Sequence, residues 1–202
     1  MTNNSQTLTS KSQYSDVWLI SHSPRRVQLL RDLGIPFQVG ESHVDEKYPD
    51  SLEPEEIPVY LSQLKSDNAN VQIDNNTLII TADTIVWAEG MLLGKPADAA
   101  EARQMLHLIS GKTHQVITGV TLRSKEKRRS FFEKTDVTFS TISDADIDYY
   151  IECYKPFDKA GAYGIQEWIG MVGVESINGC FYNVMGLPLH HLYKEMVSFC
   201  VK

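Results

Sequence analysis

The chain has 202 residues, of which 42% are hydrophobic, and its 19 basic and 26 acidic residues give a formal net charge of -7. A chain of this length can bury a substantial core, either as a single domain or as two closely joined lobes. The acidic balance argues against nonspecific binding to nucleic acid or to an anionic membrane, so any phosphate site must be local. The 3 cysteines are widely spaced without a C-x-x-C pair, which predicts reduced thiols and suggests neither a disulfide framework nor a zinc site.

The beginning of the chain, residues 1–14, is polar and rich in Ser, Asn, Gln and Thr. It lacks the apolar core of a secretory signal, so we expect a disordered polar tail in front of a single domain over residues 15–202. No later segment is apolar over the length that spans a bilayer. We therefore expect a cytoplasmic protein that does not enter a membrane.

The first folded segment combines an apolar strand with a capped helix. Residues 17–20 (Val-Trp-Leu-Ile) predict a buried strand, and Ser23 can cap a helix that begins at Pro24, where the first turn needs no backbone donor. The start of that helix carries partial positive charge and unpaired N–H groups, and Arg25 and Arg26 add guanidiniums that bind phosphate oxygens. The segment predicts a phosphate site. The alternative is a capped surface helix with solvated arginines.

The remaining elements, in chain order, predict an α/β fold. Gly34 suits the end of the first helix, and residues 36–39 start a second extended segment that completes a β-α-β unit. Apolar periodicity and capping residues then predict helix 56–71, strand 77–87, helix 98–109, strands 114–122 and 131–139 joined as a hairpin, helix 143–153 and a final helix over about 187–197. Residues 110–113 resemble the end of a P-loop, but a helix precedes them, so we expect a turn there.

Carboxylates and lysines mark a second group of candidate residues. Asp83 lies inside an apolar strand, and burying its charge requires a compensating group. A divalent metal, a lysine or an arginine would serve, and Lys95 is close in sequence. Asp45 and Glu46 follow the second extended segment and can bring another carboxylate to the same edge of the sheet, as hard cations require. The alternatives are a structural salt bridge at Asp83 and a plain acidic loop at residues 45–46.

Two further segments allow either a binding role or a structural one. Residues 159–166 (KAGAYGIQ) combine a cation, glycines and the Gln166 amide, which suits recognition of a base or a phosphate. A glycine-rich turn with a buried tyrosine explains the same residues equally well. The basic run 125–129 lies at the expected hairpin tip, where a solvated turn is favoured over a nucleic-acid contact.

Short motifs follow a fixed order between about residues 17 and 189: S-x-S-P-R-R, D-E, A-D-T, G-K-P, S-G-x-x-H-x-V-x-T-G-V, K-A-G-A-Y-G-I-Q and N-V-x-G-L-P. Each motif is weak alone, but the ordered set resembles the Maf family of nucleoside triphosphate pyrophosphatases. The resemblance implies a Maf/inosine-triphosphatase-like α/β fold, with an elongated curved mixed sheet, flanking helices and two lobes around a cleft. It also implies a homodimer that hydrolyses a nucleoside triphosphate between its α- and β-phosphates with Mg²⁺ or Mn²⁺.

The resemblance also suggests roles for particular residues. Asp83 corresponds to the family's proton acceptor, and the residues that set nucleotide choice resemble those of the branch acting on dTTP and UTP: Arg25, Thr84 and Gln166. Other active-site positions are matched by Ser21, Arg26, Glu46 and Lys95. Glu46 and Asp83 can hold the metal, while Ser23 and Lys65 can contact the phosphates.

The chain departs from the family pattern at a position expected to matter for catalysis. Asn68 stands where the family's active-site lysine is expected, on the assumption that helix 56–71 presents residue 68 to the site. Lys65 lies three residues earlier on nearly the same helical face and can reach the same phosphate. Glu167 follows Gln166 where the family usually has glycine. The altered lysine position makes a second function worth weighing: a nucleotide-binding regulator of septum formation and cell division, with little turnover.

Overall fold

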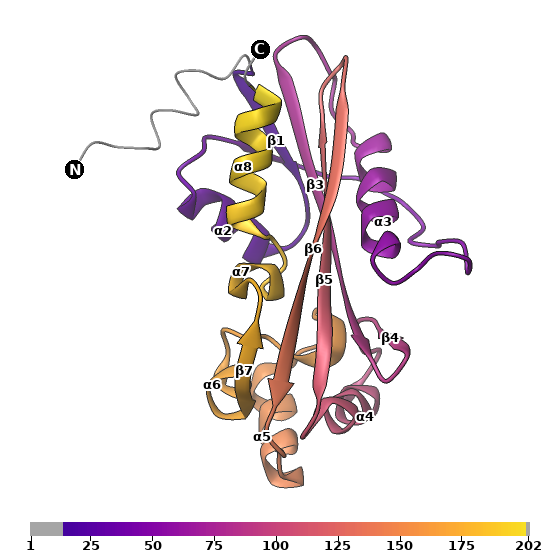
Figure 1. Cartoon of the computed structure of the whole chain (residues 1–202), viewed down its shortest axis with the longest axis vertical. Helices are drawn as coiled ribbons and strands as arrows, with labels where there is room; N and C mark the ends of the chain where they lie inside the picture. The colour runs from indigo at the N-terminus through magenta and orange to yellow at the C-terminus, as the bar shows by residue number, and fades with distance from the viewer. Residues whose placement is uncertain (1–13, 201–202) are drawn as a thin grey trace, which may run out of the picture. The chain divides into compact units, whose positions relative to one another are not determined.

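The computed structural model describes residues 14–200 and consists of helices and strands that alternate along much of the chain (Figure 1). The predicted tail over residues 1–13 lies outside the described residues. Tyr14 was expected to belong to that tail, but its side chain is buried, with its ring centroid 5.9 Å from that of Phe199. Tyr14 therefore belongs to the folded part of the chain.

The secondary structure follows the predicted order closely. The strands are β1 (Asp16–Ile20), β2 (Gln38–Gly40), β3 (Thr77–Ala88), β4 (Met91–Leu93), β5 (Thr113–Arg123), β6 (Arg128–Phe139) and β7 (Val174–Asn178). The helices are α2 (Pro24–Asp32), α3 (Glu56–Asp67), α4 (Ala99–Ile109), α5 (Asp144–Tyr154), η1 (Ala160–Ala162), α6 (Trp168–Gly173), α7 (Phe181–Val184) and α8 (Leu189–Cys200).

A mixed sheet forms the centre of the fold. Within residues 14–200 it has 7 strands in the order β2-β1-β3-β5-β6-β7, with β4 paired to β3. Strand β1 runs parallel to both β2 and β3, whereas β4 and β7 are antiparallel to their neighbours. The parallel part is the predicted β-α-β unit, because α2 connects β1 to β2. The expected α/β class with a mixed sheet and flanking helices is confirmed.

The predicted hairpin is formed by β5 and β6. Side-chain hydrogen bonds join Thr113 to Thr138 at 2.8 Å and Thr121 to Ser130 at 2.9 Å. These pairs fit an antiparallel register, because one strand's residue number rises as the other's falls. The turn is closed by the N–H of Ser124, which donates to the carbonyl of Lys127.

The predicted helix over residues 56–71 ends earlier than expected. Helix α3 stops at Asp67, and Asn68 is its C-cap with a non-helical backbone. The Asn68 side-chain amide donates to the carbonyl of Leu64 at 2.9 Å. The Asn68 backbone N–H donates to the same carbonyl at 3.2 Å, so both Asn68 donors converge on Leu64, and the helix ends four residues before Val71.

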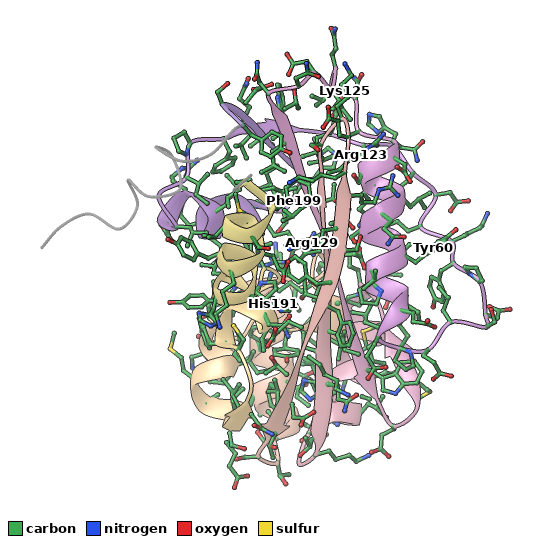
Figure 2. All side chains as sticks on the ribbon, turned by 45° about the horizontal axis from the view of Figure 1, so that its top comes forward. Tyr60, Arg123, Lys125, Arg129, His191 and Phe199 are labelled. Atoms are coloured by element: carbon green, nitrogen blue, oxygen red, sulfur yellow. The ribbon has the colours of Figure 1, made fainter. Side chains whose placement is uncertain are left out.

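The chain divides into two compact units. The first unit contains the chain up to Asp83, the segment Thr118–Glu133 and the chain from Gly186 onward. Helices α3 and α8 cover opposite faces of the hairpin in this unit. Successive side chains of β6 point to opposite faces, and they contact different helices. Ser130 bonds to Gln63 of α3, whereas Arg129 and Glu133 pair with Glu195 and His191 of α8. Figure 2 shows His191 and Phe199 on α8 and Tyr60 on α3.

The second unit contains Thr84–Ile117 and Lys134–Met185. Helices α4 and α5 are joined by ion pairs from Arg103 to Asp144 and Asp148. The apolar core of this unit includes Leu106, Ile109, Val116, Phe139, Ile147, Tyr150 and Ile169. None of the helices described between residues 14 and 200 has the length and hydropathy needed to cross a membrane.

Candidate active site

The candidate site in the first unit begins where β1 ends. Ser21 follows the last strand residue, Ile20, and its N–H donates to the carbonyl of Gly40 on the parallel neighbour β2. Ile20 pairs on its other side with Thr81 of β3, two residues before Asp83. Ligands of α/β proteins commonly bind beyond the carboxyl ends of parallel strands. The start of the phosphate segment and Asp83 therefore lie just beyond the paired residues of two parallel strands.

The loop between β1 and α2 is organised for an anion. Ser21 Oγ accepts a hydrogen bond from the N–H of Ser23 at 3.1 Å, and Ser23 Oγ accepts from the N–H of Arg26 at 3.5 Å. The predicted N-cap is thus confirmed, with Pro24 in the first turn. The positive end of α2 and the guanidiniums of Arg25 and Arg26 lie on the same turn, which favours binding of a negatively charged group.

Arg26 is held in place by the backbone. Its Nε donates to the carbonyl of Gly186 at 2.8 Å, and Nη1 donates to the carbonyl of Ala82 at 2.9 Å. Burial lowers the pKa of Arg26 from its usual value, and the nearby carboxylates of Asp83 and Glu46 oppose this effect. An arginine remains charged in proteins, so the loop contains an anchored positive charge next to Ala82 and Asp83.

Asp83 is buried in β3, and its charge is compensated by a lysine other than the one closest in sequence. The Nζ atom of Lys65, on α3, lies 2.5 Å from Asp83 Oδ1 and 2.8 Å from Glu46 Oε1. The Asp83 side chain is 10% exposed and that of Lys65 is 14% exposed. Lys95, by contrast, is exposed in the segment after β4 and belongs to the second unit. Both expected carboxylates therefore meet at Lys65.

This arrangement corrects the expectation about Asn68. Asn68 is exposed at the end of α3, where its amide is bonded to its own helix. Lys65 lies almost one turn earlier and brings an ammonium to Asp83. The chain therefore has a lysine in this site, and the sequence argument for a weakly active regulator no longer stands.

Glu46 and Asp83 suit a divalent cation whose other ligands come from the phosphates of a substrate. Glu46 and Asp83 both contact a single cationic atom, Lys65 Nζ, so their oxygens already converge on a positive charge. Among the described residues, no group of three or more His, Cys, Asp or Glu side chains is arranged for a metal. Mg²⁺ is commonly held by one or two carboxylates together with substrate phosphates, so these two residues suit that mode.

The remaining predicted residues belong to the second unit. Thr84 follows Asp83 in β3, so it faces the opposite side of the strand, and it is partly buried. Gln166 lies between η1 and α6, and its Oε1 atom is buried without a hydrogen-bond partner among the described residues. A buried acceptor without a donor is unfavourable, so an incoming donor would stabilise this position.

Other residues of the 159–166 segment are occupied within the protein. Lys159 pairs with Asp158 at 2.7 Å and with Glu167 at 3.1 Å. Tyr163 is buried, and its hydroxyl is 2.8 Å from Nε2 of His114. Lys159 and Tyr163 therefore have structural contacts within the protein. In the 159–166 segment, Gln166 is the residue whose buried polar atom has no hydrogen-bond partner among the described residues.

Buried His114 is best accommodated as the neutral imidazole. Its Nδ1 atom has no hydrogen-bond partner within residues 14–200, and burial lowers its pKa to about 4. Protonation would create a second N–H donor at Nδ1 with nothing to accept it. The histidine thus carries no charge at neutral pH.

Sequence reasoning did not assign roles to Gly186, Tyr150 or Glu167. Gly186 carries the carbonyl that holds Arg26, and its φ of 109° suits glycine. Its place in the N-V-x-G-L-P motif was the available signal. Tyr150 was expected only as an apolar helix residue, although its hydroxyl donates to Glu167. The sequence showed that Glu167 departs from the family pattern, but it did not show that Tyr150 is its hydrogen-bond partner.

Comparison with known proteins identifies the family. The family model described as Maf-like protein matches residues 16–199. The chain is 54% identical over 179 residues to a dTTP/UTP pyrophosphatase of Phocaeicola vulgatus, which covers 88% of this chain and 93% of that relative. It is 50% identical over 182 residues to a protein of the same name from Parabacteroides distasonis, with 90% and 94% of the two chains covered. The chain belongs to the Maf family.

Proposed function

We propose that this protein is a nucleoside triphosphate pyrophosphatase that converts dTTP and UTP to the monophosphate and pyrophosphate. The observation that carries the proposal is the cluster around Asp83: a buried carboxylate beside the ammonium of Lys65 and the anchored guanidinium of Arg26. Relatives that share about half of its residues are named dTTP/UTP pyrophosphatase, which supports the same substrate class.

The cations of the first unit suit a triphosphate. The N-terminus of α2 offers N–H donors next to Arg25 and Arg26, and Lys65 adds an ammonium held by Asp83 and Glu46. Fixed positive groups stabilise the charge that develops on phosphate oxygens when the anhydride bond breaks. Ser21 and Ser23 shape the loop in front of α2, because Ser21 Oγ accepts from the N–H of Ser23 and Ser23 Oγ accepts from the N–H of Arg26.

Asp83 serves as the proton acceptor in the proposed reaction. A water oxygen attacks a phosphorus atom of the α–β anhydride, its proton passes to an Asp83 carboxylate oxygen, and the bond from that phosphorus to the bridging oxygen breaks. The products are a nucleoside monophosphate and pyrophosphate, so all atoms of triphosphate and water are accounted for. General base catalysis of this kind contributes about 10²–10⁴-fold to the rate.

Glu46 and Asp83 would hold the divalent cation, Mg²⁺ or Mn²⁺, together with the substrate phosphates. A bound cation supplies neutralisation of the polyphosphate charge. Lys65 Nζ contacts the same two carboxylates, and the ammonium has a third N–H that can donate to a phosphate oxygen.

Selection of uracil and thymine is proposed to involve Arg25, Thr84 and Gln166. The buried Oε1 atom of Gln166 lacks a donor, and the N3–H of uracil or thymine is a suitable one. Cytosine has a bare acceptor at N3, so it would leave Oε1 unsatisfied. Sites that hydrogen-bond a substrate strongly reject an analogue that lacks the matching group.

The proposal also includes a homodimer in the cytoplasm that acts on free nucleotides, not on nucleic acid or membranes. The resemblance to the Maf family supports the dimer, and the acidic net charge of -7 argues against binding to polyanions. Light scattering coupled to size-exclusion chromatography checks the dimer, and a monomeric mass would contradict it.

The activity is tested by separating pyrophosphate from orthophosphate release. The purified chain is incubated with dTTP, UTP, CTP, ATP or GTP in the presence of Mg²⁺ or Mn²⁺. We expect pyrophosphate from dTTP and UTP well above that from the other nucleotides. Release of orthophosphate alone would overturn the reaction class, and equal rates on all bases would overturn the proposed selectivity.

A further inference from the structure

The residue after Gln166 takes part in an unusual set of contacts within the second unit. Glu167 accepts a hydrogen bond from the hydroxyl of Tyr150 on α5, and its other oxygen lies 3.1 Å from Lys159 Nζ. The Glu167 side chain is 20% exposed and that of Lys159 is 9% exposed.

Tyr150 links Glu167 to the backbone of the same loop. Its side chain is fully buried, and its hydroxyl accepts from the N–H of Gly164 at 3.0 Å while it donates to Glu167. Burial raises the pKa of Tyr150, and the hydrogen bond to Glu167 raises it further. The hydroxyl therefore remains a donor at neutral pH, and the loop is attached to α5 at both ends.

Gly164 leaves the space that these side chains fill. A Cβ atom at residue 164 would lie 2.8 Å from Cδ of Glu167 and 3.0 Å from Nε2 of Gln166. Both distances are shorter than normal carbon contacts, so any larger residue would displace the two side chains. The side chains of Gln166 and Glu167 thus lie together over the Gly164 backbone.

The opposite side of the loop is closed by the start of α6. A Cβ atom at Gly170 would lie 1.9 Å from the carbonyl oxygen of Ile165, so only glycine allows this approach. The N–H of Glu167 also donates to the carbonyl of Gly164 at 2.9 Å, which closes a turn around Gln166. The Gln166 amide is therefore carried by a short segment that is restrained on both sides.

We propose that Glu167 is a positioning residue for base selection, which holds Gln166 oriented through its contacts with Tyr150 and Lys159. This inference rests on the proposed function, because it assigns the buried Oε1 of Gln166 to the N3–H of uracil or thymine. The Lys159 ammonium acts as the counterion that keeps the Glu167 carboxylate directed at Tyr150. Glu167 itself does not touch the substrate.

The test compares Glu167→Ala, Glu167→Gln and the control Glu152→Ala by steady-state kinetics with UTP and CTP. Glu152 is an exposed residue of α5, so its replacement removes a carboxylate without touching the loop. Loss of a charged hydrogen bond predicts roughly a tenfold rise in KM for UTP in Glu167→Ala and a similar fall in the UTP/CTP ratio of kcat/KM. The value of kcat should stay within about twofold, because the proposed base Asp83 is untouched.

Glu167→Gln separates positioning from simple loss of structure. The glutamine can still accept from Tyr150, so it should recover most of the UTP/CTP ratio. Inhibition by UMP should weaken in Glu167→Ala by about the same factor as KM rises, since UMP reports base binding without chemistry. The melting temperature of each variant shows whether the enzyme is folded under the assay conditions.

The outcomes distinguish the two levels of the hypothesis. If wild type releases no pyrophosphate from UTP, the proposed function fails. If wild type is active and selective but folded Glu167→Ala keeps its KM, its UTP/CTP ratio and its affinity for UMP, the positioning role is overturned. A fall in kcat with unchanged selectivity would equally overturn it. Should Glu167→Ala not fold, a wild-type UTP/CTP ratio in the near-isosteric Tyr150→Phe would overturn it.

Discussion

Replacement of Lys65 by methionine tests the central contact of the first unit, because it removes the ammonium and keeps the length of the side chain. The buried Asp83 carboxylate then loses a partner at 2.5 Å. Breaking a buried ion pair typically costs about 3–5 kcal/mol. Arg26 still interacts with Asp83, so the expected loss of unfolding free energy lies at the lower end, about 3 kcal/mol.

The other contact of Lys65 adds little to this loss. Glu46 is 51% exposed, and pairs with solvent-exposed groups contribute about 0–1 kcal/mol. Activity should fall more clearly, because a charge-assisted hydrogen bond to phosphate contributes about 1.5–3 kcal/mol. If that bond acts in the transition state, kcat/KM for UTP decreases roughly 10- to 150-fold.

Urea unfolding followed by circular dichroism measures the first quantity, and pyrophosphate release from UTP measures the second. Asn68→Lys is the matched control, since residue 68 is exposed and its amide is bonded to Leu64. This variant should change stability by no more than about 0.5 kcal/mol and leave kcat/KM close to wild type. A severalfold gain in Asn68→Lys, or a Lys65→Met enzyme with wild-type activity, would show that Lys65 is not the functional lysine.

Three further comparisons test other parts of the two units. Asp83→Asn should lower kcat by about 10²–10⁴-fold in a protein that remains folded, as measured by pyrophosphate release and circular dichroism; a nearly normal rate would exclude Asp83 as the base. Arg25→Ala should weaken UTP turnover more than Arg129→Ala, because Arg129 is paired with Glu195 at the surface; equal losses would indicate a diffuse charge effect. His114→Phe should reduce the acid sensitivity of folding. Burial lowers the His114 pKa to about 4, so the unfolded chain binds the proton first, and up to about 3 kcal/mol of stability is lost as pH falls from about 6.5 to 4. Urea unfolding at about pH 5 and pH 7 measures this difference, which should shrink in the variant; an unchanged difference would show that other groups cause it.

Local signals were sufficient for most of the secondary structure. Ser23, Asp98 and Ser143 each cap the helix that follows, and their side chains accept hydrogen bonds from the first turn. These interactions span only three residues, so they can be inferred from neighbouring positions. The end of α3 was placed incorrectly because nothing in its apolar periodicity marks Asn68 as the cap. Its side-chain amide bonds to the Leu64 carbonyl beside the backbone N–H, and such local side-chain bonds compete with helix continuation.

The sequence by itself determined the β-α-β unit, the Ser23-capped start of α2, and Asp83 as a buried charge that needs compensation. Only the tertiary structure decided that Lys65 contacts Asp83, and that the carbonyl of Gly186, 160 positions along the chain, anchors Arg26. It also decided that Tyr150 and Lys159 hold Glu167 next to Gln166. The reason is physical: the need to compensate a buried charge follows from its local apolar surroundings, whereas the identity of the partner depends on distances in space that packing establishes.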